Sequence, residues 1–562
     1  MTEEQQQPTE KKKGCIYWSI LKWAGLVLLS LLLLIALIFQ APWKVTLLLA
    51  IFLLACTILP KPYKKHFWGG TGIVVIILII WVFLPTETEG WKPFTFDFDE
   101  EIAALNAKYA IPYSENAACI YYKLSESLDL DSNAPEFFNE SVPSSTSGPW
   151  QIKDHPEMAK WLKKQQNSID LLSQAAKFEK CHFPVNINFE SEDWPERRSD
   201  MRQCAFLLVC VINNDFAEGR IEEALEKVNT LLQMGEHLHQ EPSMLGILTG
   251  IAVKALALKP IKQFVVTDQT KDEYITLIED VLIKIKYDTS YDVLRNLEWD
   301  KLTGKSELNR YYEINEEGKI RLNRDPFAKI RNYLEEAYKN KTNDIHGIAQ
   351  RLKPYIFLNY WQKKLIKANT IITWFFMPSA PQKAAKMIDD AYEKYDAATE
   401  PDFDWTKKPE KQISLYTVWN FIRITLNFRF SPEYMADLNS ESYYRVHDFY
   451  LRMLSGKRGC LLLVALRRYK NKNGDWPKSL EQIKDYTDTD NFVDPINDGS
   501  FVYKLTDDNF TLYSKGKNNI DEDGEYKTKW DPNTTKTEII KDDWLIWPIE
   551  NCDTKEENNN DG

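Results

Sequence analysis

The sequence predicts a mainly α-helical protein built from membrane helices, a large helical domain and a small carboxyl-terminal domain. Three apolar runs separated by short polar breaks fill residues 15–85. Over residues 151–458, apolar residues recur at the spacing of about 3.6 residues that places them on one face of a helix. Residues 459–549 differ in composition, because short apolar segments there are separated by glycine, proline and aspartate.

The apolar runs cover Ile16–Phe39, Val45–Leu59 and Phe67–Leu84. A helix rising about 1.5 Å per residue needs roughly 20 apolar residues to cross a bilayer core of about 30 Å. The first and third runs reach that length, and the second requires a locally thinned membrane. A cleavable signal peptide has a single short apolar core. The runs therefore predict three retained transmembrane helices, with two buried core helices plus one span as the alternative.

Two lysine clusters define the orientation of these helices. The first lies before and within the amino-terminal end of the first run, and the second lies between the second and third runs: Lys11, Lys12, Lys13 and Lys22; Lys61, Lys64 and Lys65. Positive residues beside membrane helices favour the cytoplasmic side. We expect a multi-pass protein of a bacterial inner (cytoplasmic) membrane, with a disordered tail over residues 1–14 inside and the chain after Pro85 outside.

Composition excludes some functions. The formal net charge is -12, and no basic stripe follows a helix, so we expect no nucleic-acid partner. The sequence contains no HExxH, P-loop, GxSxG or GxGxxG motif and no CxxC pair, so nothing marks it as an enzyme. Disulfides are left open for the six cysteines after the anchor, although two lie in an apolar run and are expected to be free and buried: Cys119, Cys181, Cys204, Cys210, Cys460 and Cys552, of which Cys204 and Cys210 are those two.

Residues 86–150 are predicted to be a juxtamembrane segment and loop, because Leu128–Pro149 is rich in Ser, Asn and Pro and indicates an exposed loop. Further on, Gly219–Leu225 resembles the second helix of a tetratricopeptide hairpin, where a small residue permits close helix approach. It follows an expected break at Asn213–Glu218. No 34-residue period follows, so whether the helical domain is a true repeat array stays open.

Three shorter predictions concern the rest of the helical domain. Tyr311–Leu322 suggests a small hairpin. Ser431 and Pro432 predict a helix start, since a capping hydroxyl precedes a proline at the first helical position. That helix either breaks at Gly459 or continues to just before Gly474.

Several side chains could belong to a functional site, but a structural interpretation is preferred for each of them. His237 and His239 are two residues apart, so on a helix they face different directions, and we interpret them as surface histidines. Glu298 and Asp300 do not share a helix face and are expected to be a solvated pair. Four aromatic residues could line a glycan groove, but core packing is the preferred interpretation: Tyr311, Tyr312, Trp361 and Trp374.

The carboxyl-terminal residues carry a resemblance through the order of their motifs. Asn473-Gly-Asp-Trp-Pro477 is followed by Asp494-Pro495, Phe510–Ser514, Asp521-Glu-Asp-Gly524 and Asp542-Asp-Trp544. From Cys460 to Pro548 this order is similar to the globular part of type II secretion major pseudopilins. The resemblance implies an α+β domain in which a helix leads into short strands and an acidic loop that holds calcium. Three membrane spans and the helical domain precede it, so assembly into a fibre is not implied.

The acidic loop is the candidate calcium site. Calcium takes six to eight oxygen ligands at about 2.3–2.6 Å. Residues 519, 521, 523 and 524 match the beginning of an EF-hand loop, but Trp530 replaces the required final Glu, which disfavours an EF-hand. The resemblance implies that two following aspartates and a serine complete the shell. The predicted ligands are Ser514, Asn519, Asp521, Asp523, Asp542 and Asp543; the alternative is a solvated loop near the acidic disordered tail, residues 550–562.

The sequence thus predicts a membrane-anchored extracytoplasmic scaffold that binds other envelope proteins and holds a structural calcium ion. Two alternatives are a cell-envelope hydrolase with its site in the helical domain and a component of a secretion system. The oligomeric state is left open.

Overall fold

The computed structural model describes residues 90–128, 130, 134–138, 143–184, 193–267, 270–285, 289–323, 380–393, 432–506, 509–531 and 536–549. This part of the chain is mainly α-helical, as predicted. It belongs to two compact units, and each is described by itself. The predicted transmembrane helices at residues 15–85 and the two predicted tails lie outside the described residues.

One unit contains a three-stranded antiparallel sheet in the order β1-β2-β3. Its elements are β1 (Trp91–Pro93), η3 (Leu308–Arg310), β2 (Tyr312–Asn315), β3 (Ile320–Leu322) and most of α16 (Pro381–Glu393). The predicted hairpin is confirmed: Gly318 has φ +77 and its N–H donates to the carbonyl of Asn315 at 3.0 Å. Glycine suits this turn because it adopts positive φ without steric cost.

Strand β1 was not predicted. Trp91 pairs with Asn315 of β2, and the Arg321 guanidinium lies 3.9 Å from the centre of the Trp91 ring. Tyr311 and Tyr312 are buried, which confirms core packing for these two. Trp361 and Trp374 lie outside the described residues.

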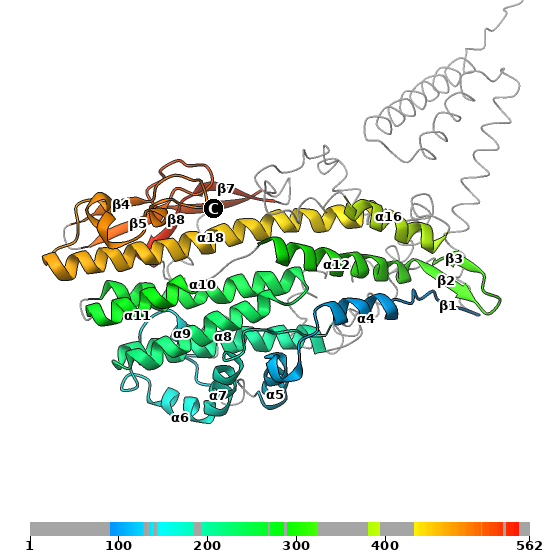
Figure 1. Cartoon of the computed structure of the whole chain (residues 1–562), viewed down its shortest axis with the longest axis horizontal. Coiled ribbons are helices and arrows are strands. Elements are labelled where there is room, and N and C mark those ends of the chain that lie inside the picture. The colour runs from blue at the N-terminus through cyan, green and yellow to red at the C-terminus, as the bar shows by residue number, and fades with distance from the viewer. Residues whose placement is uncertain are drawn as a thin grey trace, which may run out of the picture. The chain divides into compact units, whose positions relative to one another are not determined.

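The other unit contains most of the helices and the remaining strands (Figure 1). Its helices are α4 (Asp99–Lys108), α5 (Ala118–Ser127), α6 (Pro156–Lys164), α7 (Gln166–Ala175), α8 (Asp193–Ala217), α9 (Ile221–His239), α10 (Met244–Val266), α11 (Asp272–Ile283) and most of α12 (Thr289–Glu307) and α18 (Pro432–Asn473). Single 3-10 turns are η1 (Tyr113–Glu115), η2 (Ser144–Thr146), η5 (Leu480–Tyr486) and η6 (Thr489–Phe492). Helices α4 and α5 lie in the segment predicted as juxtamembrane segment and loop.

The predicted exposed loop, Leu128–Pro149, and the tryptophan after it contain buried positions among their described residues, so the prediction of exposure was wrong there. Phe138, Ser145 and Trp150 are buried. The Trp150 indole N–H donates to the carbonyl of Cys210 at 3.0 Å, and Asn213 Nδ2 donates to the carbonyl of Ser145 at 3.0 Å. Helix α8 thus supplies the hydrogen-bond partners that let this irregular segment be buried.

Gly219 ends α8, and its role differs from the predicted close approach of helices. Residues 213–217, expected to be a break, continue α8. Gly219 has φ +79; its N–H donates to the Phe216 carbonyl and that of Arg220 to the Asp215 carbonyl. These two bonds form a Schellman motif, the usual end of a helix at a left-handed glycine. The hairpin α8–α9 is present, but Gly219 belongs to its turn.

The close helix approach lies between α9 and α10. A Cβ on Gly250 would lie 2.6 Å from the carbonyl oxygen of Gly235. Helix α10 begins at a Ser243 cap, whose Oγ accepts from the Gly246 N–H at 3.0 Å. Within the described residues, α10 is long and apolar enough to cross a membrane, and just over half of it is buried inside the protein. Its apolarity therefore also suits a core helix, and residues 15–85 are not tested by this finding.

Helix α18 passes Gly459 without a break and ends at Asn473, so the expected boundary at residue 459 lies inside it. After it come β4 (Val502–Leu505), β5 (Phe510–Ser514), β6 (Tyr526–Asp531), β7 (Lys536–Asp542) and β8 (Trp544–Trp547), paired as an antiparallel sheet β4-β5-β8 and a ribbon β6-β7. A helix followed by short strands is thus present in this region, but three of the five strands come after the acidic loop.

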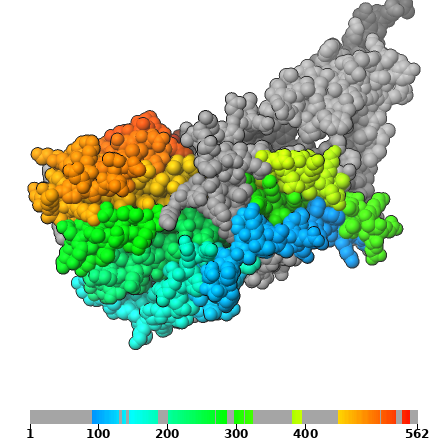
Figure 2. All heavy atoms as spheres, viewed as in Figure 1, coloured from blue at the N-terminus to red at the C-terminus, as the bar shows by residue number. Residues whose placement is uncertain are grey.

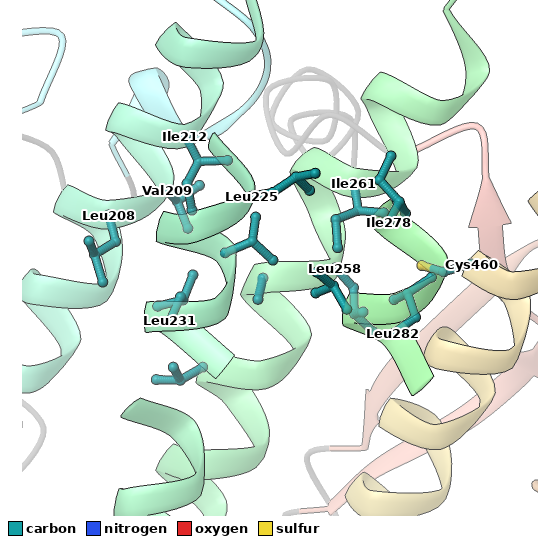
Figure 3. Packing of buried hydrophobic residues seen from close by; sticks show 14 of the residues in the cluster. Leu208, Val209, Ile212, Leu225, Leu231, Leu258, Ile261, Ile278, Leu282 and Cys460 are labelled. Atoms are coloured by element: carbon teal, nitrogen blue, oxygen red, sulfur yellow. The ribbon is translucent and has the colours of Figure 1, made fainter. Parts of the chain in front are cut away.

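One hydrophobic core joins the helices to this sheet. Leu208, Leu225, Ile261 and Cys460, from α8, α9, α10 and α18, belong to one buried cluster that reaches Ile546 of β8 (Figure 3). In the space-filling view the orange residues of the carboxyl-terminal domain lie directly against the green helices (Figure 2). The two parts of this unit are therefore expected to fold together.

A buried arginine strengthens this junction. Arg467 of α18 is almost fully buried and donates to the carbonyls of Val265 and Val266 at the end of α10. A cation there complements the partial negative charge of a helix carboxyl end. Its guanidinium also lies 4.6 Å from the ring centre of Trp476.

Candidate functional site

The acidic loop connects β5 to β6, and residues with positive φ turn its backbone. These are Gly516, Asn519, Asp523 and Gly524. The predicted ligands separate by burial: Ser514, Asp542 and Asp543 are buried, whereas Asn519, Asp521 and Asp523 are exposed.

Asp543 lies beneath the loop. Its Oδ2 accepts the backbone N–H groups of Glu522 and Gly524, each at 2.8 Å. Its Oδ1 is buried and has no hydrogen-bond partner. Burial raises the pKa of this carboxyl, and the two backbone hydrogen bonds oppose that rise. Asp543 is therefore an acceptor with one oxygen still to be satisfied.

Asp542 is held by a helix and by the loop itself. Its Oδ1 accepts from Arg452 of α18 at 3.1 Å, and its Oδ2 accepts the Lys517 backbone N–H at 2.7 Å. Ser514 Oγ is also occupied, since it accepts the Gly516 N–H at 3.0 Å. A Cβ on Gly516 would lie only 2.0 Å from the Asp542 carbonyl oxygen, so glycine is required at this crossing.

The two exposed aspartates share a lysine. Lys504 Nζ of β4 lies 2.6 Å from Asp523 Oδ1 and 3.3 Å from Asp521 Oδ1. The Tyr513 hydroxyl donates to Asp521 Oδ1 at 2.6 Å. That hydrogen bond is the main cause lowering the pKa of Asp521, and the hydrogen bond to Asp523 is the main cause raising the pKa of Lys504.

The six predicted ligands therefore do not form one coordination shell in this structure. Among the described residues no group of three or more His, Cys, Asp or Glu side chains is arranged to hold a metal ion. Asn519 lies apart, with its Oδ1 about 3.3 Å from where a Cβ on Gly499 would stand. The chemistry nevertheless fits calcium: the donors are all oxygen, and Asp543 Oδ1 is an unpaired buried acceptor.

A second polar cluster lies inside the helical part, where no functional residue was predicted. Lys254 of α10 is 2% exposed, and its Nζ lies 2.5 Å from Glu236 Oε2 and 2.8 Å from His239 Nδ1. Burial lowers the pKa of His239 well below its usual value, and the charge of Lys254 lowers it further. His239 is therefore neutral and accepts a hydrogen bond from the ammonium.

His237 points the other way and is buried too. Its Nε2 is 2.9 Å from the Phe178 carbonyl, so it carries the proton, and its Nδ1 accepts from the Tyr121 hydroxyl at 2.9 Å. Burial lowers the pKa of His237 to about 4. The prediction of surface histidines was wrong, because His239 is buried against α10 and His237 is buried against Tyr121 and Phe178. The sequence signal for this buried cluster was Lys254, which is the single charged residue in the apolar run 244–258. The same run contains Gly246 and Gly250.

The remaining predicted residues have structural partners or are buried. Glu298 forms an ion pair with Lys108 at 2.6 Å and accepts from the Tyr109 hydroxyl at 2.8 Å. Asp300 is partly exposed, as is Glu298. Within the described residues, Cys204 and Cys210 are free and buried, which confirms that prediction.

Comparisons of the chain with family models, curated proteins and solved structures gave no match.

Proposed function

We propose that the chain is a membrane-anchored extracytoplasmic protein whose folded part binds other envelope proteins and whose carboxyl-terminal loop takes a structural calcium ion. The apolar runs within residues 15–85 supply the anchor, and the flanking lysines favour an exterior location for the rest.

The buried Asp543 carboxylate is the observation that carries the calcium part. A buried oxygen without a hydrogen-bond partner costs free energy. Calcium supplies such an oxygen with a strong electrostatic partner. Asp521 and Glu522 belong to the loop that covers Asp543, and both already raise the pKa of Asp543 by charge repulsion. A divalent cation would relieve that repulsion.

The interaction role is supported by how the helical part uses its reactive side chains. His237, His239 and Lys254 are buried and bound to one another's helices or to Tyr121 and Phe178. Groups held this way stabilise the packing of helices and are not presented to a substrate. The continuous core from α8 to β8 supplies a stable body for binding partners.

Thermal melting of the full-length chain in detergent tests the calcium part. A ligand that binds only the folded state stabilises it by about 2.7 kcal/mol at a hundred times its dissociation constant. We expect a higher melting temperature in excess CaCl2 than in chelator, and loss of that difference in Asp543→Asn. Asp485→Asn, an exposed acid outside the loop, should keep the response. The same melting temperature with calcium and chelator contradicts the proposal.

An alkaline phosphatase fusion at the carboxyl end tests the location. The enzyme folds only outside the cytoplasm, so activity is expected. An inactive fusion, together with a fluorescent cytoplasmic reporter at the same position, would place the folded part inside the cell.

A further inference from the structure

Lys504 occupies the position that a cation bound to the exposed side of the acidic loop would take. Its Nζ lies 3.3 Å from Asp521 Oδ1 and 2.6 Å from Asp523 Oδ1. Both aspartates are predicted calcium ligands. An ammonium and a calcium ion therefore require the same oxygen atoms and cannot hold them together, since the two cations repel each other.

We propose that Lys504 is a built-in competitor for calcium, which neutralises Asp521 and Asp523 in the metal-free loop and is displaced when the ion binds. This inference rests on the proposed calcium site and adds how that site is regulated. The ligand class is a divalent cation with a preference for carboxylate oxygens.

The structure allows Lys504 to leave at low cost. Its side chain is 43% exposed, and that of Asp523 is 86% exposed. Exposed ion pairs contribute little to stability, so water can replace the aspartates around the ammonium. The backbone of Lys504 stays fixed by pairing with Thr511 of β5. Only the flexible side chain has to move.

The lysine neutralises only part of the loop. It reaches the exposed aspartates, whereas Asp543 Oδ1, buried under Glu522 and Gly524, has no hydrogen-bond partner. This oxygen is a buried acceptor that does not depend on the Lys504 contacts, and a cation is a suitable partner for it. The Lys504 ammonium makes its contacts with the two exposed aspartates, so it leaves the charge of the buried carboxylate to another cation, and carboxylate oxygens are the ligands that calcium prefers.

Isothermal titration of the full-length chain in detergent with CaCl2 tests the competition. In Lys504→Met we expect calcium to bind about fivefold more tightly. The reason is that calcium no longer has to break the ion pair with Lys504, and a fivefold change in affinity corresponds to about 1 kcal/mol. Lys504→Arg keeps the charge and should stay near the wild-type affinity. The matched control is Lys541→Met, because Lys541 forms an ion pair with Glu525 at 2.5 Å and is similarly exposed.

Lys541→Met removes the same charge without freeing a predicted calcium ligand. The calcium affinity of this variant should therefore differ from that of the wild type by less than about twofold. Equal tightening in Lys504→Met and Lys541→Met would overturn the competition and leave a general charge effect. Equal affinity in wild type and Lys504→Met would overturn it while keeping the calcium site. Binding in neither protein would remove both the competition and the calcium part of the proposed function. Binding only in Lys504→Met supports both.

Discussion

Two lysines show how burial decides what an ion pair does in this protein. Lys254 is 2% exposed and holds Glu236 and His239 between two closely packed helices. Lys504 is 43% exposed and holds Asp521 and Asp523 at the surface of a loop. Removing a partner from a buried pair leaves a charge or acceptor that water cannot reach, whereas water readily replaces an exposed partner. The first lysine is therefore part of the core, and the second is exchangeable.

The largest change in stability is expected at the crossing of α9 and α10, where Lys254 is buried. In Gly250→Ala the new Cβ would lie 2.6 Å from the Gly235 carbonyl oxygen and 3.0 Å from the backbone nitrogen of His239. Backbone atoms cannot move aside cheaply, so we expect a loss of about 3 kcal/mol in unfolding free energy, measured by urea denaturation.

Gly456→Ala in α18 is the matched control, because its Cβ would meet Leu258 Cδ1 at an ordinary 3.4 Å. Alanine is favoured over glycine in a helix interior by up to about 1 kcal/mol, so this variant should be neutral or more stable. Equal losses in the two variants would show that α9 and α10 are not in tight contact.

Acid should weaken the buried region through its histidines. The pKa of His237 is about 4 in the folded protein, against about 6.5 when unfolded. Between these values the unfolded chain binds the extra proton, so stability is full above pH 6.5 and falls as pH decreases. From pH 7 to pH 5 we expect His237 alone to lower the unfolding free energy by about 2 kcal/mol.

The comparison protein for this pH effect is His237→Gln, whose amide can still donate to the Phe178 carbonyl. Its unfolding free energy, followed by urea denaturation at several pH values, should decline less steeply over the same range. An identical decline in both proteins would mean that His237 is already accessible to protons when folded.

The loss of unfolding free energy expected from Lys254→Met is smaller than that from Gly250→Ala. The substitution keeps much of the apolar stem and removes the ammonium, leaving His239 Nδ1 without its donor. Glu236 is 41% exposed and can be rehydrated, so the loss should be below the range for a fully buried pair, at about 2 kcal/mol. Chemical denaturation measures it, and an unchanged stability would contradict the structural role of Lys254.

The sequence predicts where helices and strands form better than it predicts which residues are buried. The β2–β3 hairpin and the start of α18 at Pro432 follow from local signals, a glycine turn and a proline at the first helical position. The segment before α6 shows the limit: its Ser and Pro residues predict turns, but whether a turn is buried depends on Asn213, almost 70 residues away. Likewise, nothing local to Trp91 indicates pairing with Asn315.

The candidate site shows the same division. The sequence identifies the acidic residues of the loop, since carboxylates and turn residues are adjacent there. It does not identify Lys504, Arg452 or the orphaned Oδ1 of Asp543, because these depend on how β4, α18 and β8 meet the loop. Lys254 and His239 are brought together by the crossing of two helices, which no periodicity within either helix specifies.

The contrast between the two lysines is tested most directly by measuring Lys254→Met and Lys504→Met side by side, in chelator and in CaCl2. Lys254→Met should melt at a lower temperature in both conditions and keep the wild-type response to calcium. Lys504→Met should melt near the wild type in chelator, with a change below about 0.5 kcal/mol, and reach its calcium-stabilised state at lower calcium concentration. The account would be contradicted if Lys504→Met were the less stable protein in chelator, or if calcium acted on both variants alike.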